Sequence, residues 1–176
     1  HSFPWVKKSW FHRFFFDHFV APHLVHTHRV DGILSFQNVT IPHTSVPQIL
    51  YVHQPLPFSE YRFSLRDSFL LWTYQNVIGR LIMRSIRRAR IVIIQTEWLR
   101  KACIEKSGEA ADKFVVVRPK IRSMPNVAFS PKPEHFSTFF YPASAIPYKN
   151  HRIIIEACKA LGKDANKDYS VIFTLR

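Results

Sequence analysis

The sequence contains few glycines and few cysteines. Its four glycines are Gly32, Gly79, Gly108 and Gly162. They stand too far apart to form the G-x-G-x-x-G turn that holds the diphosphate of a nicotinamide dinucleotide, which argues against a nicotinamide-dependent Rossmann enzyme. The cysteines, Cys103 and Cys158, lack C-x-x-C spacing. We therefore expect neither a disulfide framework nor a zinc ribbon, and we predict that both thiols are core or half-buried residues.

Long hydrophobic runs and acidic residues are also scarce. No apolar run approaches the roughly 20 residues that a transmembrane helix needs, and no signal-peptide pattern is found, so we expect a cytoplasmic protein. Lys and Arg number 25 against 12 Asp and Glu, which gives a formal net charge of +13. A surface of this charge attracts polyanions, namely nucleic acid, anionic lipid headgroups or phosphorylated substrates.

Residues 1–28 combine basic and aromatic side chains. The aromatic ones are Trp5, Trp10, Phe11, Phe14, Phe15, Phe16 and Phe19. Such a segment is typical either of a helix lying on an anionic membrane surface or of a core helix with a solvated face, and the sequence leaves both open. His26 and His28 would share one face of a strand, as metal ligands can, but no third ligand follows at a suitable spacing.

Strand and helix patterns alternate through residues 30–118. Short apolar, β-branched runs at 33–36, 49–52, 91–95 and 114–118 predict strands, and the run at 91–95 is typical of a strand covered on both faces. Residues 64–90 have helical spacing with Gly79 as a weak point, and a second helix is predicted from the N-cap Thr96 to Gly108. The alternation predicts a doubly wound, Rossmann-like α/β domain over residues 1–124.

Proline interrupts the pattern after residue 118, and the same pattern then restarts. We interpret residues 125–136 as a linker and residues 137–176 as the start of a second Rossmann-like domain. A strand at 138–141, a helix closed by Gly162 and a strand at 171–175 are predicted there. The fold class is therefore α/β, and we expect the chain to be a fragment that is truncated at both ends.

Polar side chains follow two of the predicted strands at the edge where open α/β sheets bind ligands. Gln37 and Asn38 come directly after one strand, and His53 and Gln54 directly after the next. A titratable imidazole at this edge is a candidate for chemistry, although a histidine satisfied by hydrogen bonds is the competing interpretation.

A second candidate group lies in the loop at 142–150. Lys149 stands just before a predicted helix, where free N–H groups and the positive helix pole favour phosphate. Taken alone, Lys149 is equally typical of a solvated loop lysine. Considered together with His53 and the two predicted domains, it predicts a diphosphate site that includes Ser144 and Asn150 of the same loop.

Four segments carry a resemblance to a known family: ILYVHQPLPF at 49–58, RARIVIIQTEW at 88–98, KFVVVRP at 113–119 and FYPASAIPYKNH at 140–151. In order and spacing they resemble the GT-B glycosyltransferases, specifically the large retaining, family 4-like group that builds capsule, O-antigen and exopolysaccharide from nucleotide sugars. The resemblance implies a nucleotide-sugar donor held by the second domain and a saccharide or lipid-linked acceptor held by the first.

The same resemblance implies roles for individual residues. His53 matches the family's histidine beside the reacting sugar, and Gln37, Asn38 and Gln54 would lie on the acceptor side of the cleft. Lys149 matches the lysine that binds the donor diphosphate and stabilises the leaving group, so neither a metal ion nor another cofactor is expected. A lipid-linked acceptor would suit a basic, aromatic first domain in peripheral contact with an anionic membrane, at its inner face.

The sequence departs from the family pattern at three places. Pro142 and Ala143 stand where the family often has Gly-Arg, and the glycine-rich turn expected near the start is missing. The paired glutamates that grip the donor would lie beyond Arg176, so we expect this fragment alone to be inactive. No Asp-x-Asp pair occurs, which argues against a metal-dependent glycosyltransferase of the other main fold.

Two alternatives remain open. A nucleic-acid-binding module is suggested by the net charge and by the arginine-rich stretch from Arg80 to Arg90. That stretch is equally typical of a solvated helix face, and we expect no specific nucleic-acid partner. A GT-B sugar-nucleotide epimerase would share the same cleft but would need no acceptor.

Overall fold

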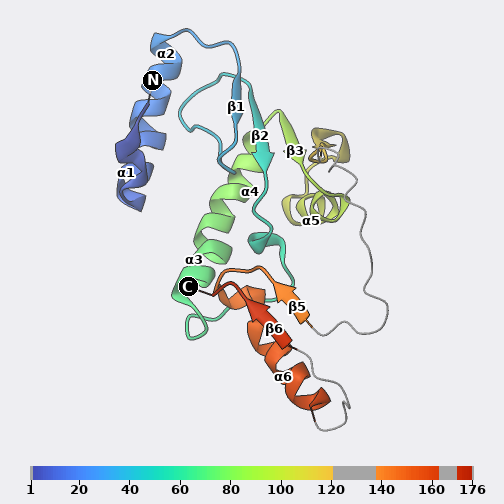
Figure 1. Cartoon of the computed structure of the whole chain (residues 1–176). Helices are drawn as coiled ribbons and strands as arrows, with labels where there is room; N and C mark the ends of the chain where they lie inside the picture. The colour runs from blue at the N-terminus through green and yellow to red at the C-terminus, as the bar shows by residue number, and fades with distance from the viewer. Residues whose placement is uncertain (1, 121–137, 163–169, 176) are drawn as a thin grey trace. The chain divides into compact units, whose positions relative to one another are not determined.

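A computed structural model describes residues 2–120, 138–162 and 170–175 (Figure 1). The chain divides into two compact units, His1–Ile121 and Arg122–Arg176. The predicted linker at 125–136 lies outside the described residues.

The first unit is built on a parallel sheet. Its strands are β1 (Ile33–Ser35), β2 (Gln48–Val52), β3 (Ile91–Ile94) and β4 (Phe114–Val116), and they form a four-stranded sheet in the order β1-β2-β3-β4. All three pairings are parallel, with Ser35 opposite Leu50 and Leu50 opposite Val92. The α/β class and the four strands are therefore confirmed. The four described strands lie side by side in the order in which they occur in the chain. A doubly wound sheet has a point at which this order reverses, and these strands do not include one.

One continuous helix connects β2 to β3. It consists of α3 (Phe69–Thr73), the π-helical turn η4 (Tyr74–Ile78) and α4 (Gly79–Arg88). The sequence placed its start at residue 64, which is too early, because Ser64 and Asp67 exchange hydrogen bonds in a turn and Ser68 is the N-cap. The helix continues through Gly79, which is buried and whose added Cβ would lie 3.1 Å from Pro57 Cβ. Glycine there permits close packing against η3 (Leu56–Phe58).

The helix between β3 and β4 begins and ends where the sequence predicted. In α5 (Glu97–Ser107), Thr96 Oγ1 accepts from Leu99 N–H as an N-cap, and Gly108 adopts the left-handed conformation with φ 71° at the C-cap. A short helix, η5 (Ala111–Lys113), leads into β4.

The core lies between one face of the sheet and the helices α4 and α5 (Figure 1). Alternate residues of β2 and β3 point into it, and Leu50, Val92, Ile82 and Ile86 are 0 % exposed. This packing is the expected consequence of β-branched and leucine side chains alternating along parallel strands.

The opposite side of the sheet is open among the described residues. We call it the bare face, and it carries Leu34, Phe36, Val115 and Val117, each between 44 % and 58 % exposed. Ile91 and Ile93, which also lie on this side of β3, are only half-buried. The prediction that residues 91–95 are covered on both faces is therefore wrong for the part of the chain that the structure describes.

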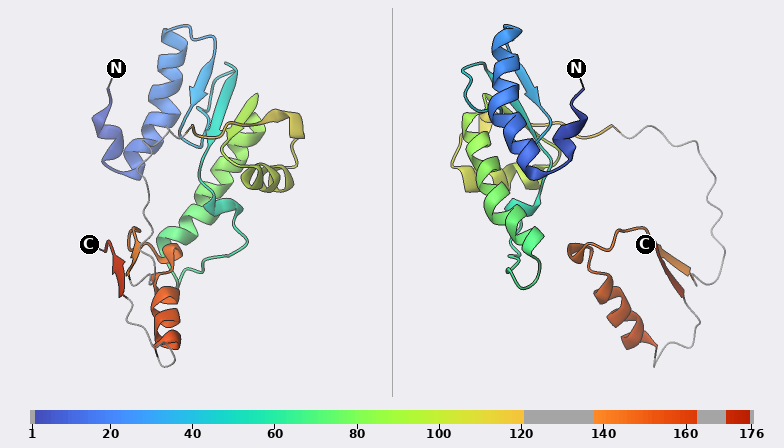
Figure 2. Two further views of the ribbon diagram at one scale, coloured as in Figure 1. Left: turned by 45° about the vertical axis from the view of Figure 1, so that its right-hand side comes forward. Right: turned by 90° about the vertical axis from the view of Figure 1, so that its left-hand side faces the viewer.

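A second continuous helix precedes the sheet. After η1 (Pro4–Lys7) it runs through α1 (Trp10–Phe15), the π-helical turn η2 (Phe16–Val20) and α2 (Ala21–Thr27). Pro22 has no N–H to donate to the preceding turn, which explains the widened turn just before it. Figure 2 shows this blue segment beside β1, the edge strand. His26 lies in α2 and His28 is its C-cap, so the prediction that they share a strand face is wrong.

The second unit contains one βαβ motif among its described residues. Strand β5 (Thr138–Tyr141) pairs in parallel with β6 (Ser170–Phe173), and between them lie η6 (Pro147–Lys149) and α6 (His151–Leu161). The predicted strand at 138–141 is confirmed, and the last strand ends at Phe173 rather than at residue 175. None of the described residues of this unit is buried. Across both units, no helix in the described ranges has the length and apolar character to cross a membrane.

Candidate functional site

The carboxyl ends of β1 and β2 bring three of the predicted residues together. Asn38 Oδ1 accepts from the backbone N–H groups of His53, at 2.8 Å, and Gln54, at 3.0 Å. Asn38 Nδ2 lies 3.2 Å from His53 Nε2. Because parallel strands end at one edge of the sheet, residues separated by a long loop become direct neighbours.

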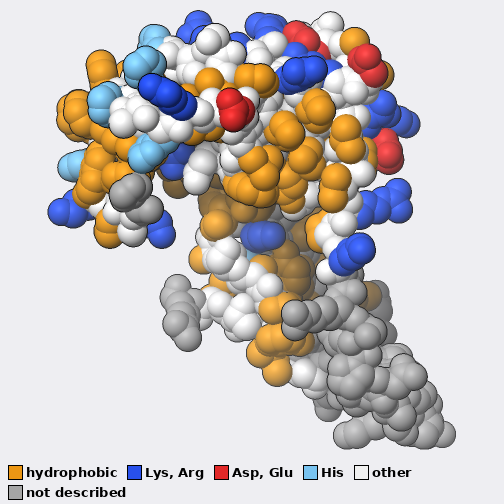
Figure 3. All heavy atoms as spheres, turned by 90° about the horizontal axis from the view of Figure 1, so that it is seen from above, with side chains coloured by type: hydrophobic (Ala, Val, Ile, Leu, Met, Phe, Trp, Pro, Cys, Tyr) orange, Lys and Arg blue, Asp and Glu red, His pale blue; other side chains and the backbone are white. Residues whose placement is uncertain are grey.

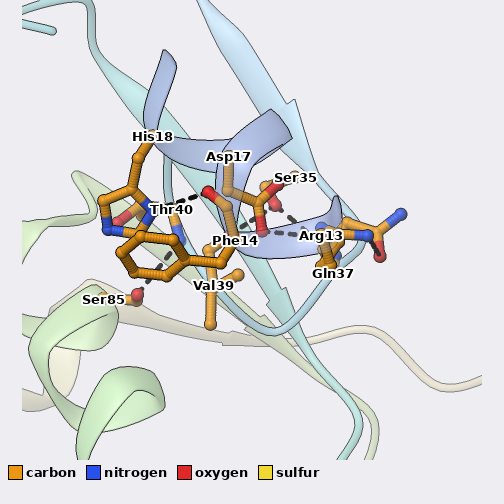
Figure 4. Close-up of polar contacts among 9 residues, drawn as sticks. All are labelled: Arg13, Phe14, Asp17, His18, Ser35, Gln37, Val39, Thr40 and Ser85. Carbon is orange, nitrogen blue, oxygen red and sulfur yellow. Dashed lines mark hydrogen bonds and ion pairs between the residues drawn. The ribbon is translucent and has the colours of Figure 1, made fainter. Parts of the chain in front are cut away.

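The loop that carries Asn38 is held by buried polar side chains rather than by a helix. Ser35 Oγ donates to Val39 O at 2.6 Å, and Thr40 N–H donates to Ser85 Oγ of α4 at 3.0 Å (Figure 4). At its far end the Gln48 side chain exchanges two hydrogen bonds with the backbone of Ile41. These bonds satisfy side chains that would otherwise be buried without partners, and they fix the loop's path.

Asn38 itself has a backbone conformation that few residues adopt. Its φ is 61°, in the left-handed region, where asparagine is much better tolerated than branched or bulky residues. The sequence placed Asn38 at the strand end but contained no signal for this conformation.

Gln37 is oriented differently from the other predicted residues. Its Oε1 accepts from Arg13 Nη1 at 2.9 Å, and Arg13 Nε is 2.7 Å from Asp17 Oδ2 (Figure 4). The side chain therefore links the strand end to α1 and η2, and it bonds to Arg13 rather than to His53. Sequence reasoning placed Gln37 in the cleft because it did not foresee an arginine partner 24 positions earlier.

Two further residues belong to this edge and were not predicted. The Tyr51 ring lies 5.7 Å from the His53 ring, with an interplanar angle of 34°, because residues two apart share one side of a strand. Gln95 Nε2 donates to the Tyr51 hydroxyl. Gln95 is the first residue after β3, so the rule that identified His53 would also have found it.

The core cysteine, Cys103, is not a reactive group. Cys103 is 0 % exposed within α5, and burial raises the pKa of its thiol to about 12. A thiol held this far above neutral pH stays protonated and is inert. The prediction of a core cysteine is confirmed for Cys103, and Cys158 of α6 is half-buried, also as predicted.

The second unit contains the other predicted group. Lys149 is exposed, its Nζ lies 5.4 Å from the centre of the Tyr148 ring, and its carbonyl accepts from Tyr141 Oη at 2.7 Å. Asn150 is the N-cap of α6 with φ 50°, and its side chain makes no capping bond. Ser144 is exposed in the same loop, and its carbonyl accepts from Ile146 N–H. In the chain, Lys149 therefore directly precedes the N-cap of α6, a helix end whose free N–H groups favour an anion.

Tyr141 and His151 complete the surroundings of this loop. The His151 ring lies 5.2 Å from the Tyr141 ring, and His151 Nε2 is buried without a hydrogen-bond partner among the described residues. Sequence reasoning did not select either residue, because both belong to elements that read as ordinary strand and helix.

No cluster of three or more His, Cys, Asp or Glu side chains that could hold a metal ion is found within residues 2–120, 138–162 and 170–175. Comparison with protein-family models finds no model that matches the chain, and comparison with the curated proteins finds no match either.

Proposed function

We propose that this chain is part of a retaining GT-B glycosyltransferase. It would move a sugar from a nucleotide-sugar donor to a saccharide or lipid-linked saccharide during synthesis of a cell-surface polysaccharide such as capsule or lipopolysaccharide. The observation that supports this proposal best is the set of Asn38, His53 and Gln54 at the carboxyl edge of a parallel sheet. Ligands of open α/β sheets bind at this edge.

The proposal assigns the two predicted groups to the two halves of the reaction. His53 would lie beside the reacting sugar and contact one of its hydroxyls, with Asn38 and Gln54 on the acceptor side. Lys149, with Ser144, Asn150 and the N-terminus of α6, would bind the donor diphosphate. The full doubly wound sheets and the pairing of two Rossmann-like domains are part of this proposal.

The chemistry follows from charge. When the bond between the anomeric carbon and the phosphate oxygen breaks, negative charge develops on the leaving diphosphate, and the Lys149 ammonium with the helix N–H groups would stabilise it. The acceptor oxygen would attack the same face of the sugar and pass its proton to a phosphate oxygen of the leaving group. Configuration is then retained, and no metal ion or other cofactor is required.

Binding of a nucleoside diphosphate tests the diphosphate site without needing turnover. Calorimetry with UDP, GDP, ADP and dTDP, in the presence of EDTA, should find one that binds with a stoichiometry of one. Lys149→Ala should then weaken its binding by about 10-fold to 100-fold, the effect of losing a charge-assisted hydrogen bond. Lys159→Ala, on the same unit in α6, is the matched control and should bind as the wild type does. Unchanged binding by Lys149→Ala would remove the diphosphate assignment.

The N-terminal helix supports a proposed contact with an anionic membrane. Its exposed aromatic side chains are Trp10 (54 %), Phe11 (74 %), Phe14 (54 %), Phe15 (44 %) and Phe19 (61 %). Figure 3 shows hydrophobic side chains gathered beside the pale-blue histidines of this region. Lys7 and Lys8 lie next to them in the chain. Rings at the headgroup level with cations against anionic lipid are the usual pattern of an interfacial helix, and a lipid-linked acceptor would be reached there.

Vesicle sedimentation tests this contact. The chain should sediment with phosphatidylglycerol vesicles and much less with phosphatidylcholine vesicles. A Phe11→Glu, Phe19→Glu double variant should lose most of the binding, because it removes two exposed rings and adds two negative charges. Leu65→Glu, at another exposed apolar residue (55 %), is the control and should keep it. Equal loss in both variants would point to general charge rather than to the helix.

A nucleic-acid-binding module remains the alternative from a different class. The arginines Arg80, Arg84, Arg87, Arg88 and Arg90 are all exposed on or just after α4. This alternative predicts oligonucleotide binding that weakens steeply but persists at moderate salt, whereas binding that disappears entirely there reflects charge alone. Sugar-nucleotide epimerisation without an acceptor would identify the third possibility, an epimerase.

A further inference from the structure

We propose that Asn38 is the positioning residue that holds His53 in the Nδ1–H tautomer, so that the imidazole acts as a hydrogen-bond donor and not as a base. The tautomer follows from three hydrogen bonds within the described residues. The role of the donor N–H toward a sugar rests on the proposed function.

The orientation of the Asn38 amide is the first step. Its oxygen faces two backbone N–H groups, those of His53 at 2.8 Å and Gln54 at 3.0 Å. Only an oxygen can accept from a backbone N–H, because the amide nitrogen carries donors alone. The hydrogen-bond network therefore leaves no freedom to exchange the two ends of this amide, an exchange that is otherwise difficult to exclude.

The tautomer of His53 is the second step. The amide nitrogen that remains, Asn38 Nδ2, lies 3.2 Å from His53 Nε2. Since Nδ2 can only donate, Nε2 must accept, and its lone pair is used in this bond. A neutral imidazole has one N–H and one lone pair, so the proton of His53 is on Nδ1.

The surroundings of Nδ1 are the third step. His53 is exposed, and no hydrogen bond to its Nδ1 is made by the residues that the structure describes. The Tyr51 ring lies beside the imidazole, tilted by 34° with its centre 5.7 Å away, and this contact uses neither ring nitrogen. The Nδ1–H is therefore available to an acceptor oxygen from outside the described residues.

Asparagine is suited to this position for two reasons. The left-handed backbone of Asn38, φ 61°, is accessible to asparagine at low cost, as it is to aspartate and glycine. Glycine would keep the backbone but lose all three bonds, and aspartate would keep the two backbone bonds but place a second oxygen opposite Nε2. Asn38→Asp therefore changes the His53 contact while preserving the turn.

The consequence for the proposed reaction concerns the acceptor proton. With its Nε2 lone pair used by Asn38, His53 in this arrangement has no free basic nitrogen. It would instead donate from Nδ1 to a hydroxyl oxygen of the bound sugar and hold that sugar in place. The proton of the attacking hydroxyl then goes to the phosphate oxygen of the leaving group, which balances the transfer.

Long-range ¹⁵N–¹H spectra of the histidine-labelled chain test the tautomer directly. They are recorded at alkaline pH, where the imidazoles are neutral, and His53 is assigned by the signal lost in His53→Gln. The wild type should show Nδ1–H in an excess of about tenfold, the ratio that one typical hydrogen bond supports. Asn38→Asp should shift the proton to Nε2, and Asn38→Gly should abolish the preference for Nδ1–H.

Two controls separate positioning from folding. Gln37→Ala changes the neighbouring residue, which contacts Arg13, and should leave the His53 signals unchanged. Near-ultraviolet circular dichroism should show that Asn38→Asp keeps the native packing. A wild-type spectrum with the proton on Nε2, or identical His53 spectra in the wild type and Asn38→Asp, would overturn the proposal.

A titration with the nucleotide sugar whose nucleotide binds in the calorimetric test distinguishes the tautomer from its role. A downfield shift of the Nδ1–H proton on addition of the sugar nucleotide, absent with the nucleotide alone, would support donation to the sugar. An Nδ1–H signal that does not respond overturns the donor role, even where the tautomer is as proposed. Loss of nucleotide binding altogether would count against the proposed function and would leave the Asn38 spectra unaffected.

Discussion

Both units are built from βαβ motifs, but they bury very different amounts of side-chain surface. In His1–Ile121, α4 and α5 cover a four-stranded sheet, and Leu50, Ile82 and Val92 are removed from solvent completely. In Arg122–Arg176, the described residues include a two-stranded sheet and α6, yet none of them is buried. A single βαβ motif has too little surface to enclose a core, so its residues depend on further elements for burial.

This difference affects the two candidate sites. His53 stands at the end of a strand whose neighbours are packed, and three hydrogen bonds with Asn38 fix the segment around it. The loop of Lys149 is tied to its strand by a hydrogen bond from Tyr141 to the lysine carbonyl, while the ammonium is exposed. We expect the first site to be preorganised and the second to be ordered largely by its ligand.

The largest expected difference between the units is in core truncation. Ile82→Ala removes a fully buried side chain and should lower the free energy of unfolding of the first unit by about 2–5 kcal/mol. Ile155 of α6 is 45 % exposed, so Ile155→Ala should lower the free energy of unfolding of the second unit by well under 1 kcal/mol. Peptide-level hydrogen exchange measures each unit separately. Similar losses in both variants would show that α6 is packed as tightly as α4.

Cysteine labelling gives the next largest contrast. Because burial raises the pKa of the Cys103 thiol to about 12, its thiolate is scarce at pH 8 and it is also inaccessible. Half-buried Cys158 should react with iodoacetamide at least about 100-fold faster. Mass spectrometry of the labelled peptides measures both rates, and urea should expose Cys103. Equal rates in native buffer would contradict the packing of α5.

Helix capping gives a smaller contrast. Thr96→Ala removes the bond from Leu99 N–H that starts α5, at a cost of about 1 kcal/mol. Asn150→Gly should cost nothing measurable, because the Asn150 side chain makes no capping bond and its φ of 50° suits glycine. Urea unfolding with hydrogen exchange of each helix provides the comparison. A loss of stability in Asn150→Gly would reveal a capping role that the geometry lacks.

The smallest effect concerns the turn that precedes α3. Hydrogen bonds from the backbone and side chain of Ser64 lower the pKa of exposed Asp67. A folded pKa below the unfolded value means that the carboxylate stabilises the turn above the ordinary aspartate pKa, about 3.9, and that this is lost as pH falls through the lower folded value. The protection of the Ser64 amide, measured relative to its intrinsic exchange rate at each pH, should decrease over that acid range. Asp67→Asn should remove the pH dependence of this protection, and an unchanged protection profile would contradict the assignment.

The strands and both ends of α5 could be predicted from sequence because they depend on local chemistry. Runs of β-branched residues located β2 and β3, and Thr96 and Gly108 marked the ends of α5. Features that depend on distant partners were missed. The sequence could not show that Gln37 would accept a hydrogen bond from Arg13, that Asn38 would adopt a left-handed backbone, or that Gly79 would pack against Pro57.

The same limit explains the error on β3. A continuous run of Ile91, Val92, Ile93 and Ile94 is typical of a strand between two layers, yet only one layer covers it among the described residues. Whether a strand is covered depends on elements elsewhere in the chain or assembly, which the run itself cannot report. The part of the candidate site that depends on strand ends was predictable, because the predicted ends of β1 and β2 placed Asn38 and His53 at the same edge of the sheet.

The bare face has a practical consequence for measuring stability. Dyes such as anilinonaphthalene sulfonate fluoresce on exposed apolar surface and are the usual sign of a loosely packed state. Leu34, Phe36, Val115 and Val117 offer such a surface in the folded chain. We therefore expect the folded chain to bind such a dye, and dye fluorescence from this protein would not by itself show that its core is loosely packed.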